Sequence, residues 1–308
     1  MNQTVKVAVV MVTFNRLDYL KVALEKLLNQ EFKPAKIFVI NNCSTDGTKE
    51  YLSTLDDDSL EVINLDKNLG GAGGFSKGLE LAYNAGNFDY YWVMDDDTYV
   101  NPDTLKEFVE ALNKFEDVDK VGILASNVRW NETDQPSIMN TPITCPEDWN
   151  YKATEGLIKI ASSSFVSMLI SNKALVECGL PISEFFIWGD DVEFSRRVMQ
   201  KFSGYFVSNS IVNHETKANS GVDMLEEKNP NKIGRYFYAI RNDSYIAREF
   251  SKREKYRNSV KFWYLFFKLI FGKSPYSMKK LKVLIKGYWS GKFFNPKIKY
   301  LEPKNEEK

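Results

Sequence analysis

Three consecutive aspartates, Asp95, Asp96 and Asp97, follow the hydrophobic run formed by residues 90–94. Carboxylates held side by side raise one another's pKa unless a cation or several hydrogen-bond donors meet them. Because side chains alternate along an extended backbone, we expect Asp95 and Asp97 on one side and Asp96 on the other. Two adjacent carboxylates suit Mg²⁺ or Mn²⁺ shared with phosphate oxygens. An acidic turn exposed to solvent is the alternative.

Two further groups contain residues that could do chemistry. His214, the single histidine of the chain, ends an apolar stretch, and an imidazole with two carboxylates is a sensible ligand set for Mn²⁺. A purely structural histidine is the alternative. Asp190, Asp191 and Glu193 open a predicted helix after an aromatic run. These carboxylates are suited to hold an acceptor hydroxyl and take its proton, although acidic residues also cap helix N-termini.

The elements that must position these groups alternate between strand and helix patterns over the first 125 residues, which predicts a parallel sheet flanked by helices. Apolar runs predict strands at residues 5–12, 36–40, 60–65 and 89–94. A polar cluster follows each of them, at residues 13–16, 41–46, 68–74 and 95–97. Since ligands bind beyond the carboxyl ends of parallel strands, we expect the four clusters to converge on one edge of the sheet.

The third cluster is rich in glycine and runs from Asn68 to Phe75 without matching a Walker loop or a complete G-x-G-x-x-G fingerprint. Glycine lets the backbone approach a ligand closely, and a tight packing turn is the alternative. Further on, Asn101-Pro102 predicts a helix with proline at its first position that extends to Phe115. Residues 127–150 predict a long loop, and such loops are usually functional. Later elements are predicted as strands at 157–161, 165–170 and 205–212 and helices at 192–202 and 231–250.

Composition excludes several classes of protein. With 308 residues, 44% hydrophobic and 27% charged, the chain is typical of a globular protein and not of a disordered or low-complexity one. Its three cysteines, Cys43, Cys145 and Cys178, lie far apart, which excludes a disulfide framework and favours a cytoplasmic setting. We recognise no secretory leader, and no run approaches the roughly 18 apolar residues of a membrane-spanning helix.

Charge divides the chain near residue 250. Residues 251–300 hold 14 lysines and arginines and one acidic residue, Glu254, whereas residues 1–250 hold 25 basic and 37 acidic residues. We therefore predict a catalytic domain at 1–250 and a basic, aromatic, helical extension at 251–308. Basic residues with interfacial aromatics suit a helix that lies on an anionic membrane. Alternatively, the extension packs on the catalytic domain or on a second subunit, which would make a homo-oligomer. Nucleic acid is not an expected partner, because the remaining surface is acidic.

In their order and spacing, these clusters resemble family 2 glycosyltransferases of the GT-A fold. The resemblance rests on residues 13–16, on residues 41–47 and on the three aspartates. The chain is also similar to bacterial galactofuranosyltransferases, and related rhamnosyltransferases share much of the pattern. The motifs behind this narrower similarity are Asn68 to Phe75, Met94 to Asp97, Trp188-Gly189-Asp190-Asp191, His214 and Tyr236 to Asn242. Together they cover about residues 5–250.

The resemblance implies a GT-A type α/β domain that transfers a sugar with inversion in a metal-dependent reaction. The implied donor is UDP-galactofuranose, and the implied acceptor is a hydroxyl of a lipid-linked cell-surface glycan on the cytoplasmic face of the plasma membrane. Asp95, Asp97 and His214 would bind Mn²⁺ or Mg²⁺, and Asp191 would be the general base. Donor and acceptor would be bound by Thr13, Arg16, Asn42, Asn68, Gly71, Asp96, Trp188 and Asp190.

Three alternatives stay open at this point. A rhamnosyltransferase would use dTDP-rhamnose as its donor. A nucleotidyltransferase also uses paired aspartates and a metal, but it would leave His214 and the pair Asp190 and Asp191 without a shared role. A nucleotide-sugar-binding scaffold protein at the membrane would have no catalytic activity, and a transfer assay with Mn²⁺ and then with EDTA distinguishes it from an enzyme.

Overall fold

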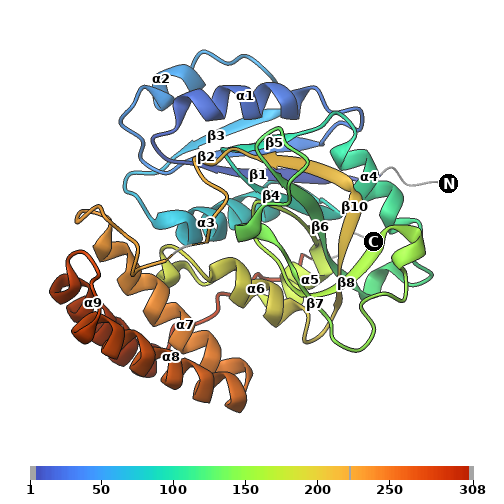
Figure 1. Ribbon diagram of the computed structural model, residues 1–308. Helices are drawn as coiled ribbons and strands as arrows, with labels where there is room; N and C mark the ends of the chain where they lie inside the picture. Colours follow the sequence, from blue (N-terminus) through green and yellow to red (C-terminus); the bar gives the residue numbers. More distant parts are fainter. Residues whose placement is uncertain (1–4, 222, 305–308) are drawn as a thin grey trace.

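The computed structural model describes residues 5–221 and 223–304, and its centre is one mixed sheet with helices on both faces (Figure 1). Within these residues the sheet has ten strands in the order β3-β2-β1-β4-β9-β6-β10-β8-β7, with β5 paired to β10. The first four strands are β1 (Val7–Thr13), β2 (Lys36–Asn41), β3 (Leu60–Asn64) and β4 (Tyr90–Asp95). They pair in parallel. The strands predicted in this part of the chain are confirmed.

Beyond β4 the sheet becomes mixed. The remaining strands are β5 (Thr98–Val100), β6 (Val121–Trp130), β7 (Ile143–Thr144), β8 (Leu157–Ser162), β9 (Ser167–Ser171) and β10 (Ser203–His214). β9 lies antiparallel between β4 and β6, and β10 runs parallel to β6 but antiparallel to β5 and β8. The expected α/β fold is confirmed, with parallel pairing through the first four strands and mixed pairing after them.

Two sequence predictions were wrong in this second half. The loop predicted at 127–150 begins inside β6, whose polar last residues are paired with β10. The helix predicted from Asn101 is α4 (Thr104–Leu112), because the Thr104 hydroxyl accepts a hydrogen bond from the Asn101 backbone N–H at 2.9 Å and forms a turn before the helix. Phe115 lies beyond the helix and packs on Tyr205 with ring centroids 4.8 Å apart.

Strand β1 explains why helices cover both faces of the sheet. All seven of its residues are buried, as in a strand with no solvent-exposed face. Val7, Val9 and Met11 point into a core shared with α1 (Leu17–Leu28) and α4. The alternate residues point to the opposite core, which is shared with α3 (Gly70–Ala85), α5 (Asn172–Cys178) and α6 (Asp190–Val198). The short helix α2 (Thr48–Leu52) follows β2.

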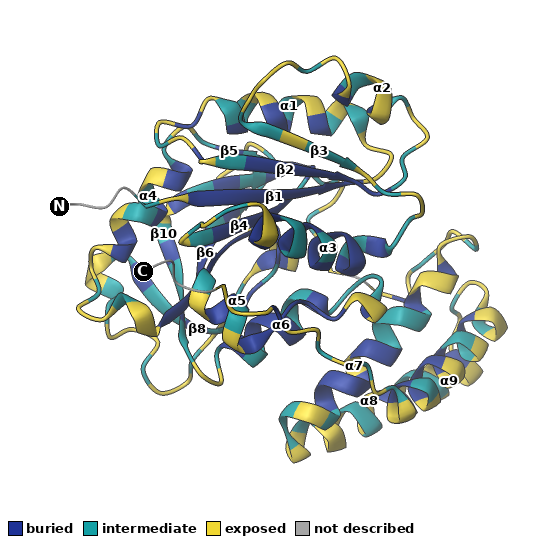
Figure 2. Cartoon of the chain, turned by 180° about the vertical axis from the view of Figure 1, so that it is seen from behind, coloured by how far each residue is buried: buried dark blue, intermediate teal, exposed yellow. Residues whose placement is uncertain are grey.

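The C-terminal helices form a separate group beside the sheet domain (Figures 1 and 2). They are α7 (Tyr236–Phe250), α8 (Lys252–Phe271) and α9 (Ser277–Phe293), and Phe262 stacks on Tyr288 between α8 and α9 at 4.0 Å. The chain then returns to the sheet domain, where the Leu180 backbone N–H donates to the Lys299 carbonyl at 2.8 Å. The helix predicted at 231–250 is confirmed over most of its length. None of the helices in the described ranges has the length and apolar character needed to cross a membrane.

Candidate active site

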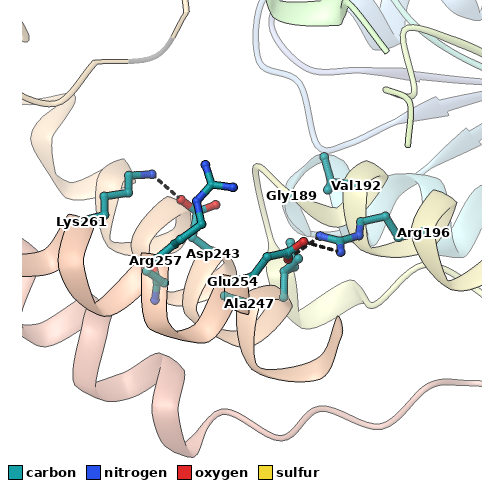
Figure 3. Close-up of a pocket in the computed structure, with 10 residues that line it drawn as sticks. Gly189, Val192, Arg196, Asp243, Ala247, Glu254, Arg257 and Lys261 are labelled. Atoms are coloured by element: carbon teal, nitrogen blue, oxygen red, sulfur yellow. Dashed lines mark hydrogen bonds and ion pairs between the residues drawn. The ribbon is translucent and has the colours of Figure 1, made fainter. Parts of the chain in front are cut away.

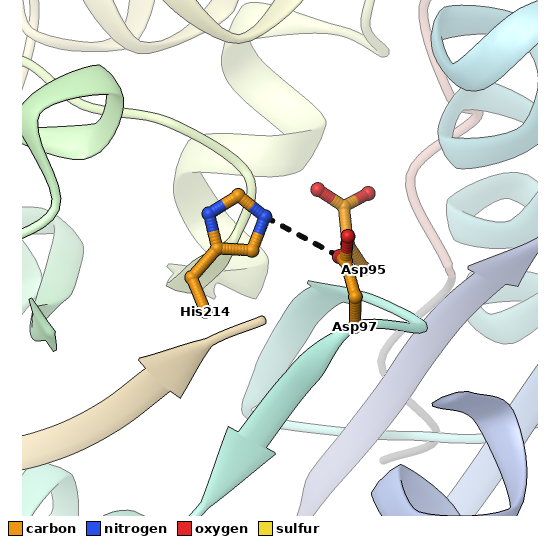
Figure 4. A group of neighbouring side chains, drawn as sticks. All are labelled: Asp95, Asp97 and His214. Atoms are coloured by element: carbon orange, nitrogen blue, oxygen red, sulfur yellow. Dashed lines mark ion pairs between the residues drawn. The ribbon is translucent and has the colours of Figure 1, made fainter. Parts of the chain in front are cut away.

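Asp95, Asp97 and His214 meet at the carboxyl end of β4 (Figure 4). One ligand atom from each side chain lies within 4.8 Å of the other two. After Asp97 the chain turns into β5, which pairs antiparallel with the end of β10 and sets His214 opposite Thr98. The Glu215 backbone N–H also donates to the Asp97 carbonyl at 2.9 Å. The long-range pairing of β5 with β10 therefore brings the single histidine to the aspartates.

The donor atoms of this cluster fit a divalent cation. His214 Nε2 lies 3.3 Å from Asp97 Oδ1, which is buried and has no hydrogen-bond partner among the described residues. The other ring nitrogen, Nδ1, lies 2.8 Å from the Asn140 side-chain oxygen. A cation between Nε2 and the two carboxylates would satisfy atoms that the protein leaves unpaired, and one imidazole with two carboxylates suits Mn²⁺ or Mg²⁺.

Asp96 points away from this cluster, as the alternation of side chains predicts. Its carboxylate accepts a hydrogen bond from the Phe14 backbone N–H at 3.3 Å and lies 3.4 Å from the Arg16 guanidinium. Arg16 also forms an ion pair with Asp97, and 48% of the Arg16 side chain is exposed. One arginine therefore links the loop after β1 to the aspartates, and part of it remains accessible to a ligand.

Burial and charge shift the pKa values in this cluster in different directions. Burial and the neighbouring Asp97 carboxylate raise the pKa of Asp95 to about 6 and that of Asp96 to about 7. Burial also acts on Asp97, but its pairing with His214 and Arg16 outweighs burial and lowers its pKa. The carboxylates likewise outweigh burial at His214 and raise its pKa. The cluster thus holds more negative charge than its two cationic neighbours neutralise.

The polar clusters after β1, β2 and β3 lie beside one another, so their predicted convergence is confirmed. Thr13 and Asn41 end neighbouring strands in register. The Asn42 side chain donates to Asn68 Oδ1 at 3.1 Å and to the Gly70 carbonyl at 3.0 Å, and it accepts from the Leu69 backbone N–H at 2.8 Å. Asn42 and Asn68 therefore hold the glycine-rich loop in place.

Two glycines of this loop are required for close packing and not for the approach of a ligand. A Cβ on Gly70, whose φ is +72°, would lie 1.9 Å from the Phe186 carbonyl oxygen, and one on Gly74 would lie 2.6 Å from Val12. For these two positions the predicted packing turn is the better explanation. Gly71 differs, because nothing lies within 4 Å of the place where its Cβ would be. Space for a ligand therefore remains at Gly71.

Asp190 and Asp191 form the first turn of α6 and have no ion-pair partner in the described part of the chain. Burial raises the pKa of both carboxyls, to about 6 for Asp191, and at Asp190 repulsion from Asp191 adds to the effect. The negative charge of Asp191 also contributes to the raised pKa of Asp95, so the two acidic groups lie within Coulombic range of each other. Glu193 is different: it pairs with Arg197 at 2.8 Å and serves the structure.

The turn before α6 is strained and is held by α7. Phe186, Trp188 and Gly189 have φ values of 65°, 66° and 87°, a region that residues other than glycine rarely adopt. The buried Asn242 side chain donates hydrogen bonds to three carbonyls of this turn at 2.7 to 3.1 Å. Arg241 donates to the Glu184 carbonyl at 2.6 Å. In the sequence these two residues stand out only as the end of the motif from Tyr236 to Asn242, and this motif does not reveal that they hold the turn.

A cavity of about 350 Å³ lies beside this turn, between α6 and the helices α7 and α8 (Figure 3). Gly189 and Val192, which flank the two aspartates, line it. Two ion pairs cross or border the cavity: Arg196 binds Glu254 through two contacts of 2.8 Å, and Lys261 binds Asp243 at 2.9 Å. Trp188 packs on Tyr236 nearby, with ring centroids 5.5 Å apart.

Solved structures that resemble this fold are glycosyltransferases. A structure of GalNAc-T7 with UDP, GalNAc and Mn²⁺ superposes with a TM-score of 0.64 and 15% identity over 93% of this chain and 55% of that one. Residues 1–349 of TarS from Staphylococcus aureus with UDP-GlcNAc give a TM-score of 0.55 and 17% identity over 92% of this chain and 81% of that one. At this level of identity they establish the GT-A fold and nothing finer.

Among curated proteins, galactofuranosyltransferase GlfT1 of Mycobacterium tuberculosis is 27% identical over 206 residues. That alignment covers 64% of this chain and 66% of the relative, so the chain spans slightly less than two thirds of the relative's length. The family model for glycosyl transferase family 2 matches residues 8–173, a range that includes the three aspartates and the glycine-rich loop. Because this match spans more than half of the chain, the protein belongs to glycosyltransferase family 2.

Proposed function

We propose that this protein is a metal-dependent, inverting glycosyltransferase that transfers galactofuranose from UDP-galactofuranose to a hydroxyl of a lipid-linked glycan. The observation that supports it most is the meeting of Asp95, Asp97 and His214 within Coulombic range of Asp191, which has no ion-pair partner among the described residues. Family membership and the similarity to a galactofuranosyltransferase support the reaction class and the donor.

In this proposal Asp191 is the general base. It removes the proton from the acceptor hydroxyl while the hydroxyl oxygen forms a bond to the anomeric carbon and the bond to the diphosphate breaks, which inverts the configuration. A pKa near 6 leaves Asp191 ionised at neutral pH but more basic than an ordinary aspartate. Asp190, its neighbour at the start of α6, holds a sugar hydroxyl of the acceptor.

The donor side of the site is formed by the other predicted residues. A Mn²⁺ or Mg²⁺ ion held by Asp95, Asp97 and His214 would supply positive charge for the departing diphosphate. The accessible guanidinium of Arg16 is suited to orient the same phosphates. We assign the remaining donor and acceptor contacts to Thr13, Asn42, Asn68, Gly71, Asp96 and Trp188.

A panel of nucleotide sugars tests this function. We expect UDP-galactofuranose with Mn²⁺ to give product of inverted configuration and EDTA to abolish the activity. Turnover of dTDP-rhamnose in its place would correct the donor, and binding without turnover of any donor would indicate a scaffold protein. Activity that persists in EDTA would contradict the metal dependence.

We also propose that α8 and α9 bind the cytoplasmic face of an anionic membrane, where a lipid-linked acceptor resides. Large hydrophobic side chains are exposed along both helices, and Figure 2 shows exposed residues alternating with buried and intermediate ones there. They are Tyr256, Val260, Trp263, Tyr264, Phe267, Ile270, Phe271, Met278, Ile285, Trp289 and Phe293. Residues 251–300, which contain both helices, hold fourteen basic residues and one acidic residue, and this positive charge matches an anionic lipid surface.

Liposome flotation tests this contact. The double variant Trp263→Ser and Phe267→Ser removes two side chains that are 53% and 51% exposed, and we expect it to stop flotation with anionic vesicles. Tyr151→Ser, at an 88% exposed position in the sheet domain, is the matched control and is expected to float like wild type. Equal flotation of all three proteins would contradict the proposal. A dimer that dissociates only in the double variant would instead identify the surface as a subunit interface.

A further inference from the structure

We infer that Asn140 is a positioning residue for the metal centre: its side-chain oxygen accepts the Nδ1 proton of His214 and so keeps the Nε2 lone pair free to bind the cation. Asn140 ends the short 3₁₀ helix Ile138–Asn140, which follows β6. No sequence motif points to it, because it lies 74 positions away from His214. The inference deepens the proposed function and rests on its metal site.

The Asn140 amide turns its oxygen toward the His214 ring. Its Oδ1 accepts from the Ser137 hydroxyl at 2.7 Å and lies 2.8 Å from His214 Nδ1. Its Nδ2 donates to the Ser164 hydroxyl at 3.1 Å. Asn140 and His214 are 8% and 7% exposed, so water competes little for these bonds. With the oxygen turned to the ring, Nδ1 must be the protonated nitrogen of a neutral imidazole.

This tautomer matters because of what lies on the other side of the ring. Nε2 faces Asp97 Oδ1 at 3.3 Å, and that oxygen is one of the buried atoms without a hydrogen-bond partner in the described ranges. If Nε2 carried the proton, it would occupy the position where a cation must bind. Histidine ligands commonly donate their second N–H to an oxygen, which fixes both the ring and the tautomer. Asn140 provides that oxygen here.

Backbone hydrogen bonds hold the strand at His214 but do not orient its imidazole ring, so they cannot replace the contact with Asn140. β10 is paired on both sides at His214, with Thr98 of β5 and with Trp130 of β6, so the main chain is held. The rotation of the ring and the location of its proton are set by side-chain partners alone. Removing Asn140 Oδ1 therefore perturbs the ligand nitrogen while the strand that holds His214 stays in place.

The loop around Asn140 offers a matched control. Asn219 accepts a hydrogen bond from the Ile138 backbone N–H at 2.8 Å and donates to the Pro136 carbonyl at 3.0 Å. Asn219→Ala thus removes two hydrogen bonds that hold the same loop, but it does not touch His214. Asn140→Asp keeps an oxygen at the position that accepts the Nδ1 proton, whereas Asn140→Ala removes it.

Because the chain has a single histidine, ¹⁵N-histidine labelling gives one imidazole whose two nitrogens can be observed directly by NMR. In the wild-type protein saturated with Mg²⁺, which is diamagnetic, we expect Nδ1 to be protonated and Nε2 to carry no proton. Asn140→Ala is expected to populate the other tautomer and to bind Mn²⁺ about 10- to 100-fold more weakly in calorimetry. Asn140→Asp is expected to keep the wild-type tautomer and to recover most of the affinity, and Asn219→Ala to behave like wild type.

Three results would overturn the inference. They are a wild-type ring protonated at Nε2, an Asn140→Ala variant that binds Mn²⁺ as tightly as Asn219→Ala, and a wild-type protein that binds no cation. If Asn140→Ala does not fold, the wild-type tautomer and Asn140→Asp still decide. Tight Mn²⁺ binding with the expected tautomer but without sugar transfer would refute the proposed function and leave this inference intact.

Discussion

The protein contains two groups of adjacent, buried or half-buried aspartates whose surroundings differ. Asp95 to Asp97 are met by Arg16 and by His214, and within this group one pKa is lowered while two are raised. Asp190 and Asp191 are met by no cationic side chain in the described ranges, and the pKa of each is raised. The first group thus contains one carboxyl, Asp97, whose pKa is lowered by two cation-forming neighbours, whereas the second group contains none.

The difference shows that the neighbouring side chains determine the chemistry of two otherwise similar acidic runs. Both follow an apolar or aromatic stretch, and both are partly protected from solvent. Burial makes a carboxylate more basic, and in these two groups only Asp97, which pairs with both His214 and Arg16, has enough compensation to lower its pKa. Such pairs of groups with separated pKa values are typical of sites that combine electrostatic stabilisation with acid-base chemistry.

The largest effect is expected from Asp97→Asn. The substitution removes a metal ligand and also the partner of Arg16 and His214. The loss of a catalytic metal costs several kcal/mol of transition-state stabilisation, which is about a thousandfold in turnover. We expect Mn²⁺ binding and transfer to fall together, as measured by calorimetry and product formation. Activity without measurable Mn²⁺ binding would show that the first group is not a metal site.

Asp191→Asn should distinguish the role of the aspartate pair at 190 and 191 from that of the metal-binding cluster. The general base contributes about 10²- to 10⁴-fold to turnover, so we expect a loss in this range. Mn²⁺ affinity should stay close to the wild-type value, because Asp191 is not one of the three residues in the ligand cluster. A purified, folded variant that keeps a tenth or more of wild-type turnover would contradict the assignment of the base.

The pH dependence of transfer follows from the same carboxyl. Burial raises the pKa of Asp191 to about 6, and only its ionised form accepts a proton. We therefore expect kcat/KM to be flat above about pH 7 and to fall about tenfold per pH unit below about pH 6. Steady-state kinetics with Mn²⁺ saturating at each pH check this. A profile that stays flat well below pH 6 would mean that no such base limits the reaction.

The smallest effect concerns stability without metal. Asp95, Asp96 and Asp191 have folded-state pKa values of about 6 to 7, above those of an unfolded chain, and the pKa of His214 is also raised. Their contribution to stability is thus present at low pH and lost as the pH rises through these values. The lowered pKa of Asp97 acts only below this window.

We therefore expect the Tm of the metal-free protein to rise by a few degrees as the pH is lowered from about 8 to about 5. Saturating Mn²⁺ should stabilise the protein most at the high-pH end, where the carboxylates are fully ionised. Differential scanning calorimetry measures both effects. This rise in Tm should be smaller in Asp191→Asn, which lacks one of the titrating groups. A Tm that falls as the pH is lowered from about 8 to about 5 would contradict the assigned pKa shifts.

The pattern of apolar and polar residues along the chain predicted the parallel half of the sheet. The strands β1, β2 and β4 are apolar runs and β3 alternates between apolar and polar residues, and each ends at a polar cluster, so their positions and the edge where the clusters meet were predictable. β6 was missed because polar residues, Ser126, Asn127 and Arg129, interrupt its second half, which is stabilised by pairing with β10. The role of Gly70 was not predictable either, since it depends on the carbonyl of Phe186, a residue far along the chain.

The amino-acid sequence by itself determined which chemical groups are available and in what order: three aspartates after a buried strand, an aspartate pair at a helix start and one histidine after a strand. Tertiary structure alone decided that His214 meets Asp97, that Asn140 faces the ring and that Asn242 holds the turn before α6. The physical reason is that these contacts join residues more than fifty positions apart. Such contacts form only when the mixed half of the sheet and α7 are packed in place.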